Sequence, residues 1–211
     1  MDDNKQDLAN SPFFRVMGCI GDCAALSVLW LVCSLPIITV GASTSAAFSV
    51  AGKLAAKEEH FVWKGFFSAF RRDFAIATRA WLPMVLAAAI IVGDYQIGLA
   101  NPGGLGGFLI AAAAAMGLIW LCTFGGCFAL LGRFSYAKAA YALKDGLVLC
   151  VANPKAAAVW LAVLLVMPAL YLFVPPLYYY LRLPWFFVGG GAAIIAFSYA
   201  IRPAFLKLEK K

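Results

Sequence analysis

Few residues in this sequence have side chains that could do chemistry inside a membrane. Asp22 lies about two turns into the apolar run 16–33. A charge at that depth is costly, so it indicates a solute path, a proton relay or a buried pair, unless it lies near the headgroups or only fixes packing. Ser45 and Ser49 share one helix face with Gly41 in the next apolar run. Asp22, Ser45 and Ser49 are the candidate intramembrane polar site, and a packing seam of small residues is the alternative.

The sequence contains few residues arranged for catalysis or metal binding. The only histidine, His60, follows Glu58 and Glu59 in a basic loop. These three residues could bind a metal weakly, but we favour the interpretation that they are solvated loop residues. The sequence has no H-E-x-x-H motif, no nucleophile elbow and no pair of carboxylates within one span. The six cysteines form no C-x-x-C spacing and are interpreted as packing residues: Cys19, Cys23, Cys33, Cys122, Cys127 and Cys150. We therefore predict no enzyme, no metal and no cofactor.

Composition defines the class of protein. Of 211 residues, 64% are hydrophobic and 13% charged, and the mean hydropathy is +0.88. A chain this apolar could not cover its surface with polar groups, which excludes a water-soluble globule, and it is too hydrophobic for disorder. The apolar runs lack the period-two alternation of barrel strands. The sequence predicts an all-α, polytopic helix bundle in the membrane.

Apolar runs of sufficient length give five firm spans, or six with an N-terminal helical hairpin. The run 37–51 is marginal because it is rich in Gly, Ser, Thr and Ala. The span 82–93 is expected to start inside the preceding helix. The runs are 16–33, 37–51, 82–93, 105–131, 156–174 and 185–201.

The net charge of +7 is arranged in loops between the apolar runs, which favours a lipid bilayer over nucleic acid as the partner. Lys and Arg concentrate in 53–79, in 133–155 and in the C-terminal tail, whereas 94–104 has none. By the positive-inside rule, both large basic loops and the C-terminus are cytoplasmic. The side chains of Arg79, Arg133 and Arg202 are expected to snorkel to that interface.

The loop before residue 82 has an amphipathic pattern. Its aromatic residues recur at steps of three and four, with cations beside them, which is typical of a helix lying in the membrane interface. We expect this face to dock a partner or the lipid surface. Its residues are Trp63, Phe67, Phe70, Phe74, Arg71 and Arg72.

The chain reads as a single membrane domain over residues 1–211. A polar segment, 1–14, lacks the cationic start of a signal peptide, so the first apolar run is expected to be retained. Two units with the same order, an amphipathic helix followed by a hairpin, follow the N-terminal hairpin. The expected segments are 1–14, 16–56, 61–132, 134–206 and the basic tail 207–211.

Several short motifs give the N-terminal third a family resemblance. They are Leu29-Trp30, Ser34-Leu35-Pro36, Thr39-Val40-Gly41, the run FSAFRRDF at 67–74 and, more weakly, Ala142-Leu143-Lys144-Asp145. With these motifs, the sequence resembles the YesL family of small bacterial membrane proteins over roughly residues 13–82. It departs from the family pattern at Ser27, where Asn is common, and at Ala42, where Pro is common.

The resemblance implies a multi-pass protein of the bacterial plasma membrane. Genes of the family tend to lie beside sugar-uptake ABC transporters, which implies an accessory or regulatory role in carbohydrate uptake through contacts with permease subunits. No catalytic or binding residue carries over, because none is defined for the family. A small stand-alone solute transporter or channel is the alternative function, and a homo-oligomer is compatible with both.

Overall fold

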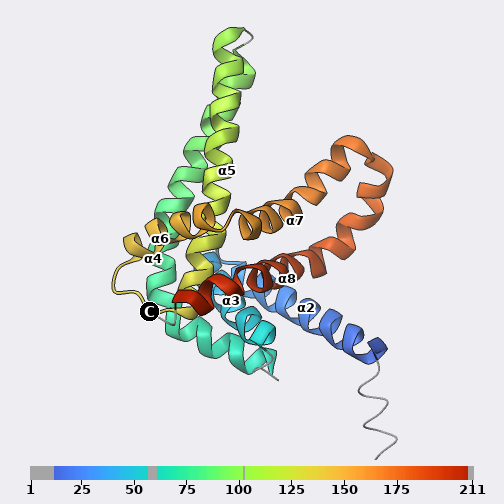
Figure 1. Cartoon of the computed structure of the whole chain (residues 1–211). Helices are drawn as coiled ribbons and strands as arrows, with labels where there is room; N and C mark the ends of the chain where they lie inside the picture. Colours follow the sequence, from blue (N-terminus) through green and yellow to red (C-terminus); the bar gives the residue numbers. More distant parts are fainter. Residues whose placement is uncertain (1–11, 57–60, 102, 209–211) are drawn as a thin grey trace, which may run out of the picture.

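A computed structural model describes residues 12–56, 61–101 and 103–208, and all regular structure in these ranges is helical (Figure 1). The all-α prediction is confirmed. The elements are α2 (Pro12–Ser34), η1 (Ile37–Thr39), α3 (Val40–Ala56), α4 (Val62–Ala100), α5 (Gly104–Arg133), α6 (Ala139–Ala152), α7 (Pro154–Phe173) and α8 (Pro175–Leu208). The polar segment 1–14 and the basic tail fall largely outside these ranges.

Among the described residues, four helical segments are long and apolar enough to cross a membrane: Ile37–Ala56, Val62–Ala100, Gly104–Arg133 and Val188–Lys207. A fifth arises if α6 and the first part of α7, which meet at a bend of 99°, count as one span. In α2, the apolar stretch Gly21–Ser34 is shorter than a full span. The marginal run 37–51 of the sequence thus lies in a segment that meets the span criteria. Several apolar helices make this a multi-pass membrane protein.

Helix α3 is the centre of the bundle. Every residue from 41 to 51 is buried, and α3 packs against α2, α4, α5 and α8. A β-carbon on Gly41 would lie 2.6 Å from the carbonyl oxygen of Ala77 in α4, and one on Gly132 would lie 2.8 Å from that of Ser45. The small residues that make this run a weak hydrophobic segment allow its backbone to approach two neighbours closely.

The hydroxyl-rich start of α3 bonds to α2 across the turn at Pro36. The indole Nε1 of Trp30 donates to the Thr44 hydroxyl at 3.0 Å, and the hydroxyls of Ser34 and Ser43 are 2.6 Å apart. Within an apolar bundle each hydroxyl needs such a partner. These bonds fix how the two helices of the N-terminal hairpin pack.

Helix α4 joins the amphipathic segment and the following span into one helix of 39 residues, as the sequence predicts. At 1.5 Å per residue it is about 58 Å long, well beyond a hydrocarbon core of about 30 Å. Figure 1 shows its first part lying beside α3 and its second part paired with α5 in a hairpin that extends away from the other helices. The most apolar windows of α4 and α5 are only 17% and 11% buried within the protein, which suits surfaces that face lipid.

The C-terminal half returns to the bundle through α8. Pro154 follows Asn153 at the bend between α6 and α7. The proline ring disfavours helical backbone angles at the residue before it, so the helix is interrupted at Asn153. After the α7–α8 hairpin, the backbone N–H of Gly191 donates to the Ser27 hydroxyl of α2 at 2.7 Å. Ser27 therefore holds α8 against α2.

Gly126 offers a test of the close helix contacts. A β-carbon on Gly126 in α5 would overlap the backbone of Gly146 in α6, so Gly126→Ala is expected to lower the free energy of unfolding by about 1–3 kcal/mol. The matched control is Gly117→Ala in the same helix, because nothing lies within 4 Å of its β-carbon position. Thermal unfolding in detergent measures both variants. Equal unfolding temperatures would contradict the close approach of α5 and α6.

Candidate functional site

A carboxylate buried among small residues links three helices. Asp73 of α4 is only 7% exposed. Arg72 donates from Nε and Nη2 to its two carboxylate oxygens, at 2.8 Å each, and the Ser45 hydroxyl of α3 lies 3.4 Å from Oδ2. Nη2 of Arg72 also donates to the carbonyl oxygen of Gly132 in α5 at 3.2 Å. Asp73 and Arg72 thus tie α3, α4 and α5 together.

Sequence reasoning missed the role of Asp73. It belongs to a second stripe of α4, next to the predicted aromatic one, that faces the core. A signal was present, because Asp73 is the only charged residue among small and apolar side chains at steps of three and four. The buried residues of this stripe are Val62, Gly65, Phe66, Ala69, Asp73, Ala77, Ala80 and Met84.

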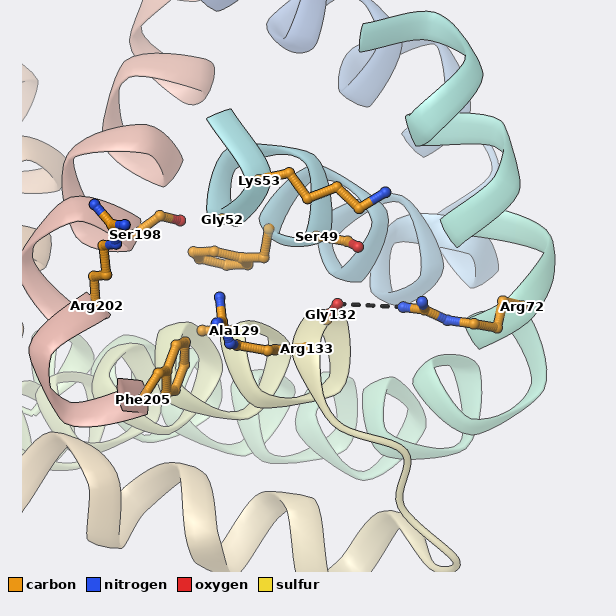
Figure 2. A pocket seen from close by; sticks show the side chains of 11 residues that line it. Ser49, Gly52, Lys53, Arg72, Ala129, Gly132, Arg133, Ser198, Arg202 and Phe205 are labelled. Atoms are coloured by element: carbon orange, nitrogen blue, oxygen red, sulfur yellow. Dashed lines mark hydrogen bonds between the residues drawn. The ribbon is translucent and has the colours of Figure 1, made fainter. Parts of the chain in front are cut away.

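Beside this ion pair lies a cavity of about 230 Å³ whose lining carries four cations, which we call the basic cavity (Figure 2). Each cation comes from a different helix: Lys53 from α3, Arg72 from α4, Arg133 from α5 and Arg202 from α8. The remaining lining residues are Phe48, Ser49, Gly52, Ala129, Gly132, Ser198 and Phe205.

The arginines of the basic cavity are held by helix ends and an aromatic ring. Nη1 of Arg202 donates to the carbonyl oxygen of Ala55 near the end of α3 at 3.0 Å, as Arg72 does to Gly132 in the last turn of α5. The last carbonyls of a helix lack partners within it and carry partial negative charge, so they attract cations. The guanidinium carbon of Arg133 lies 5.6 Å from the centroid of the Phe205 ring. Arg133 and Arg202, expected from the sequence to snorkel, thus converge on one cavity.

The structure brings together two of the three predicted polar residues. Ser45 contacts Asp73, and Ser49, one turn on, lines the basic cavity. Asp22 lies on α2, partly exposed and outside that lining. Its neighbour Cys23 packs against Gly191 of α8. Asp22 therefore belongs to a different region of the bundle from the two serines.

The predicted docking face divides between two surfaces. Trp63 is 58% exposed, and Phe67, Phe74 and Arg71 are also exposed. Phe70 is partly buried and packs against the core, and Arg72 lines the basic cavity. We call the exposed set, Trp63, Phe67, Arg71 and Phe74, the aromatic face.

Metal-ligating residues do not gather in the part of the chain that the structure describes, where no group of three His, Cys, Asp or Glu side chains could hold an ion. The run Glu58-Glu59-His60 lies outside the described residues. Cys33, Cys122, Cys127 and Cys150 are thiols. The thiol of Cys150 donates to the carbonyl oxygen of Cys122 at 3.1 Å, which is a contact between α6 and α5.

A tyrosine in the α5–α6 connection shows how this region is held. Partial burial, and then the nearby charge of Asp145 in α6, raise the pKa of Tyr136 to about 12. Its phenol therefore stays neutral at physiological pH and bonds to the Asp145 carboxylate. This contact anchors the connection to α6.

Fold and site together define a helical, multi-pass membrane protein with a basic cavity between its helices. Residues 23–95 match the model of a family described as a protein of unknown function, DUF624. The matched segment contains α3, Ser45, Ser49, Asp73 and the aromatic face. No curated protein and no solved structure matches the chain.

The ion pair at Asp73 gives a stability prediction. Asp73→Asn keeps the shape of the side chain but removes the charge that accepts both bonds from Arg72. We expect the free energy of unfolding to fall by about 1–2 kcal/mol, at the low end for a charged bond because the Arg72 side chain is 54% exposed. Thermal unfolding in detergent measures the change. Asp94→Asn on the same helix is the control, and an equal loss in both variants would argue against the linking role.

Proposed function

We propose that this protein is an accessory component of carbohydrate uptake in the bacterial plasma membrane and acts through contacts with other membrane proteins. The observation that carries the proposal is the aromatic face of α4. Trp63 and its neighbours stay exposed on the first part of a helix whose opposite side is fixed in the core. Aromatic residues and arginine are enriched where proteins bind one another.

Carbohydrate uptake enters through the resemblance to the YesL family, whose genes tend to lie beside sugar ABC transporters. Permease subunits of such a transporter are therefore the proposed partners. The positive charge of the 53–79 segment supports a cytoplasmic position of the aromatic face, where it can meet cytoplasmic loops of a permease.

The aromatic face can be tested by a double substitution. Phe67→Ser with Phe74→Ser removes two exposed rings and substitutes no residue of the buried stripe of α4, so folding and insertion should be kept. We expect at least a tenfold loss of co-purified permease from the native bacterium grown on complex sugars, since buried aromatic contacts dominate interface energetics. Quantitative mass spectrometry of the tagged protein in mild detergent measures the loss.

The control is Val148→Ser with Val151→Ser, which makes the same polar change at two exposed positions of α6. This variant should keep its partner. Unchanged recovery of permease in the phenylalanine variant would contradict docking through α4. Recovery of the wild-type protein alone would contradict the accessory function itself.

A stand-alone solute transporter is the second proposal, and the basic cavity favours it because Ser49 there lies beside polar and charged groups between helices. On this proposal Asp22, which lies in a different region of the bundle from the two serines, is a separate point on the solute path. Asp22→Asn is expected to abolish uptake of labelled sugar into proteoliposomes. An ionisable residue within a membrane segment is costly to keep there, and such residues mark substrate or ion pathways. Asp94→Asn is the control. Flux that is equal in the two variants would remove Asp22 from the path.

A further inference from the structure

A second cavity is lined by the end of α5, by α6 and by the end of α8, and we call it the α6–α8 cavity. Its volume is about 570 Å³, within the range of about 300–1,000 Å³ that is usual for pockets that hold small molecules. The wall is mainly apolar, and its polar residues come from different parts of the chain: Tyr136, Asp145, Asn153 and Lys207. An apolar wall with a few polar groups is the usual composition of a ligand site.

One stripe of α6 runs along the wall from a charged residue to apolar ones. Asp145, Val148, Leu149 and Ala152 line the cavity at steps of three and four, so they share one face of the helix. Val148 is 56% exposed, and Val151, one turn further on, is 74% exposed. Because α6 and the first part of α7 are together apolar enough for a span, the valines suit contact with acyl chains and the carboxylate suits the headgroup layer. The cavity therefore extends across the boundary between headgroups and hydrocarbon.

Asp145 and Lys207 bring one negative and one positive charge to this cavity. In the described ranges they form no ion pair with each other, and neither forms one with another residue. The neutral phenol of Tyr136 donates to the Asp145 carboxylate, which holds the carboxylate in place without neutralising it. A carboxylate has about four acceptor positions, so most of them are left for a ligand. The cavity thus offers separate partners to a cation and to an anion.

Asn153 adds an acceptor at the bend between α6 and α7. Its Nδ2 donates to the carbonyl oxygen of Leu149 at 3.0 Å, so the side-chain oxygen of Asn153 remains to accept a hydrogen bond. A primary ammonium has three N–H donors, which suit a carboxylate and an amide oxygen, whereas a quaternary ammonium has none. The ammonium of Lys207 in turn suits the oxygens of a phosphate group.

We propose that the α6–α8 cavity binds the headgroup of a phospholipid with a primary ammonium, namely phosphatidylethanolamine. The lipid ammonium donates to Asp145, the lipid phosphate accepts from Lys207, and an acyl chain lies along the exposed valines of α6. Charge complementarity favours this occupant, because its one cation and one anion match one carboxylate and one ammonium. The site does not depend on the proposed permease contact, since the aromatic face contributes no residue to it.

Binding is tested by thermal unfolding of the delipidated full chain in neutral detergent. The probes are phosphatidylethanolamine, phosphatidylcholine and phosphatidylglycerol with identical acyl chains. Phosphatidylethanolamine at about 100 times its Kd should raise the unfolding temperature by about 5–10 °C. The other two lipids lack the primary ammonium, so at the same concentration we expect at least tenfold weaker binding and about half the shift.

Two variants assign the two charges. Asp145→Asn should weaken the affinity for phosphatidylethanolamine at least tenfold and leave that for phosphatidylglycerol unchanged, because the phosphate still meets Lys207. Lys207→Gln should weaken both affinities. This split between lipids separates binding from a general loss of stability. Lys207 is exposed near the end of α8, so its variant tests the site even if Asp145→Asn fails to fold.

The controls make the same charge changes outside the cavity. Lys144→Gln, beside Asp145 on α6, and Asp94→Asn on α4 should bind phosphatidylethanolamine as the wild type does. Equal stabilisation by the three lipids, or equal losses in cavity and control variants, would overturn the proposal. Glycerophosphoethanolamine is the soluble headgroup without acyl chains, and stabilisation by it equal to that by the lipid would overturn a lipid as the occupant.

Discussion

The close approach of α3 to α4 and α5 is the constraint on which the rest of the structure depends. At Gly41 and Gly132 the backbones are too near for a β-carbon, so these positions need glycine. Small residues bury little apolar surface, so other interactions must stabilise the contacts of α3. Hydroxyls on α3 do this by bonding across the contacts, to Trp30 in α2 and to Asp73 in α4. A helix with little hydrophobic drive is therefore the most buried element. Helix α3 stabilises the bundle through close packing rather than through the transfer of apolar side chains out of water. This is expected in a membrane, because lipid is as apolar as the protein interior.

The same packing explains why charge collects at one end of the bundle. With α3 at the centre, the last turns of α3 and α5 come together beside α8, and their final carbonyls lack helical partners. Arg72 and Arg202 bond two of these carbonyls, at Gly132 and Ala55. Arg72 and Arg202 thus satisfy the helix ends that this packing brings together.

The sequence allowed the helices to be predicted but not how they meet. Apolar runs predicted the all-α fold, and the aromatic period predicted that α4 begins well before its apolar part. Asp73 escaped notice because the large aromatic residues dominate the pattern, whereas the face that packs is the one with Gly65, Ala69 and Ala77, where small size permits contact. Arg133 and Arg202 are separated by 69 positions in the chain. Nothing in local periodicity places them in one cavity, because their convergence depends on how α8 packs against α3.

The first part of helix α4 presents the aromatic face on one side and Arg72, which lines the basic cavity, on another. The positions of both follow from helical geometry. Consecutive residues differ by about 100° around the axis, so Arg71 can lie on the exposed aromatic face while Arg72 turns to Asp73 and the basic cavity. The ring of Phe70, partly buried, packs edge to face with Phe74, with ring centroids 5.5 Å apart, and stacks on the core residue Phe66. The aromatic face and Arg72, which lines the basic cavity, are therefore carried by one helix.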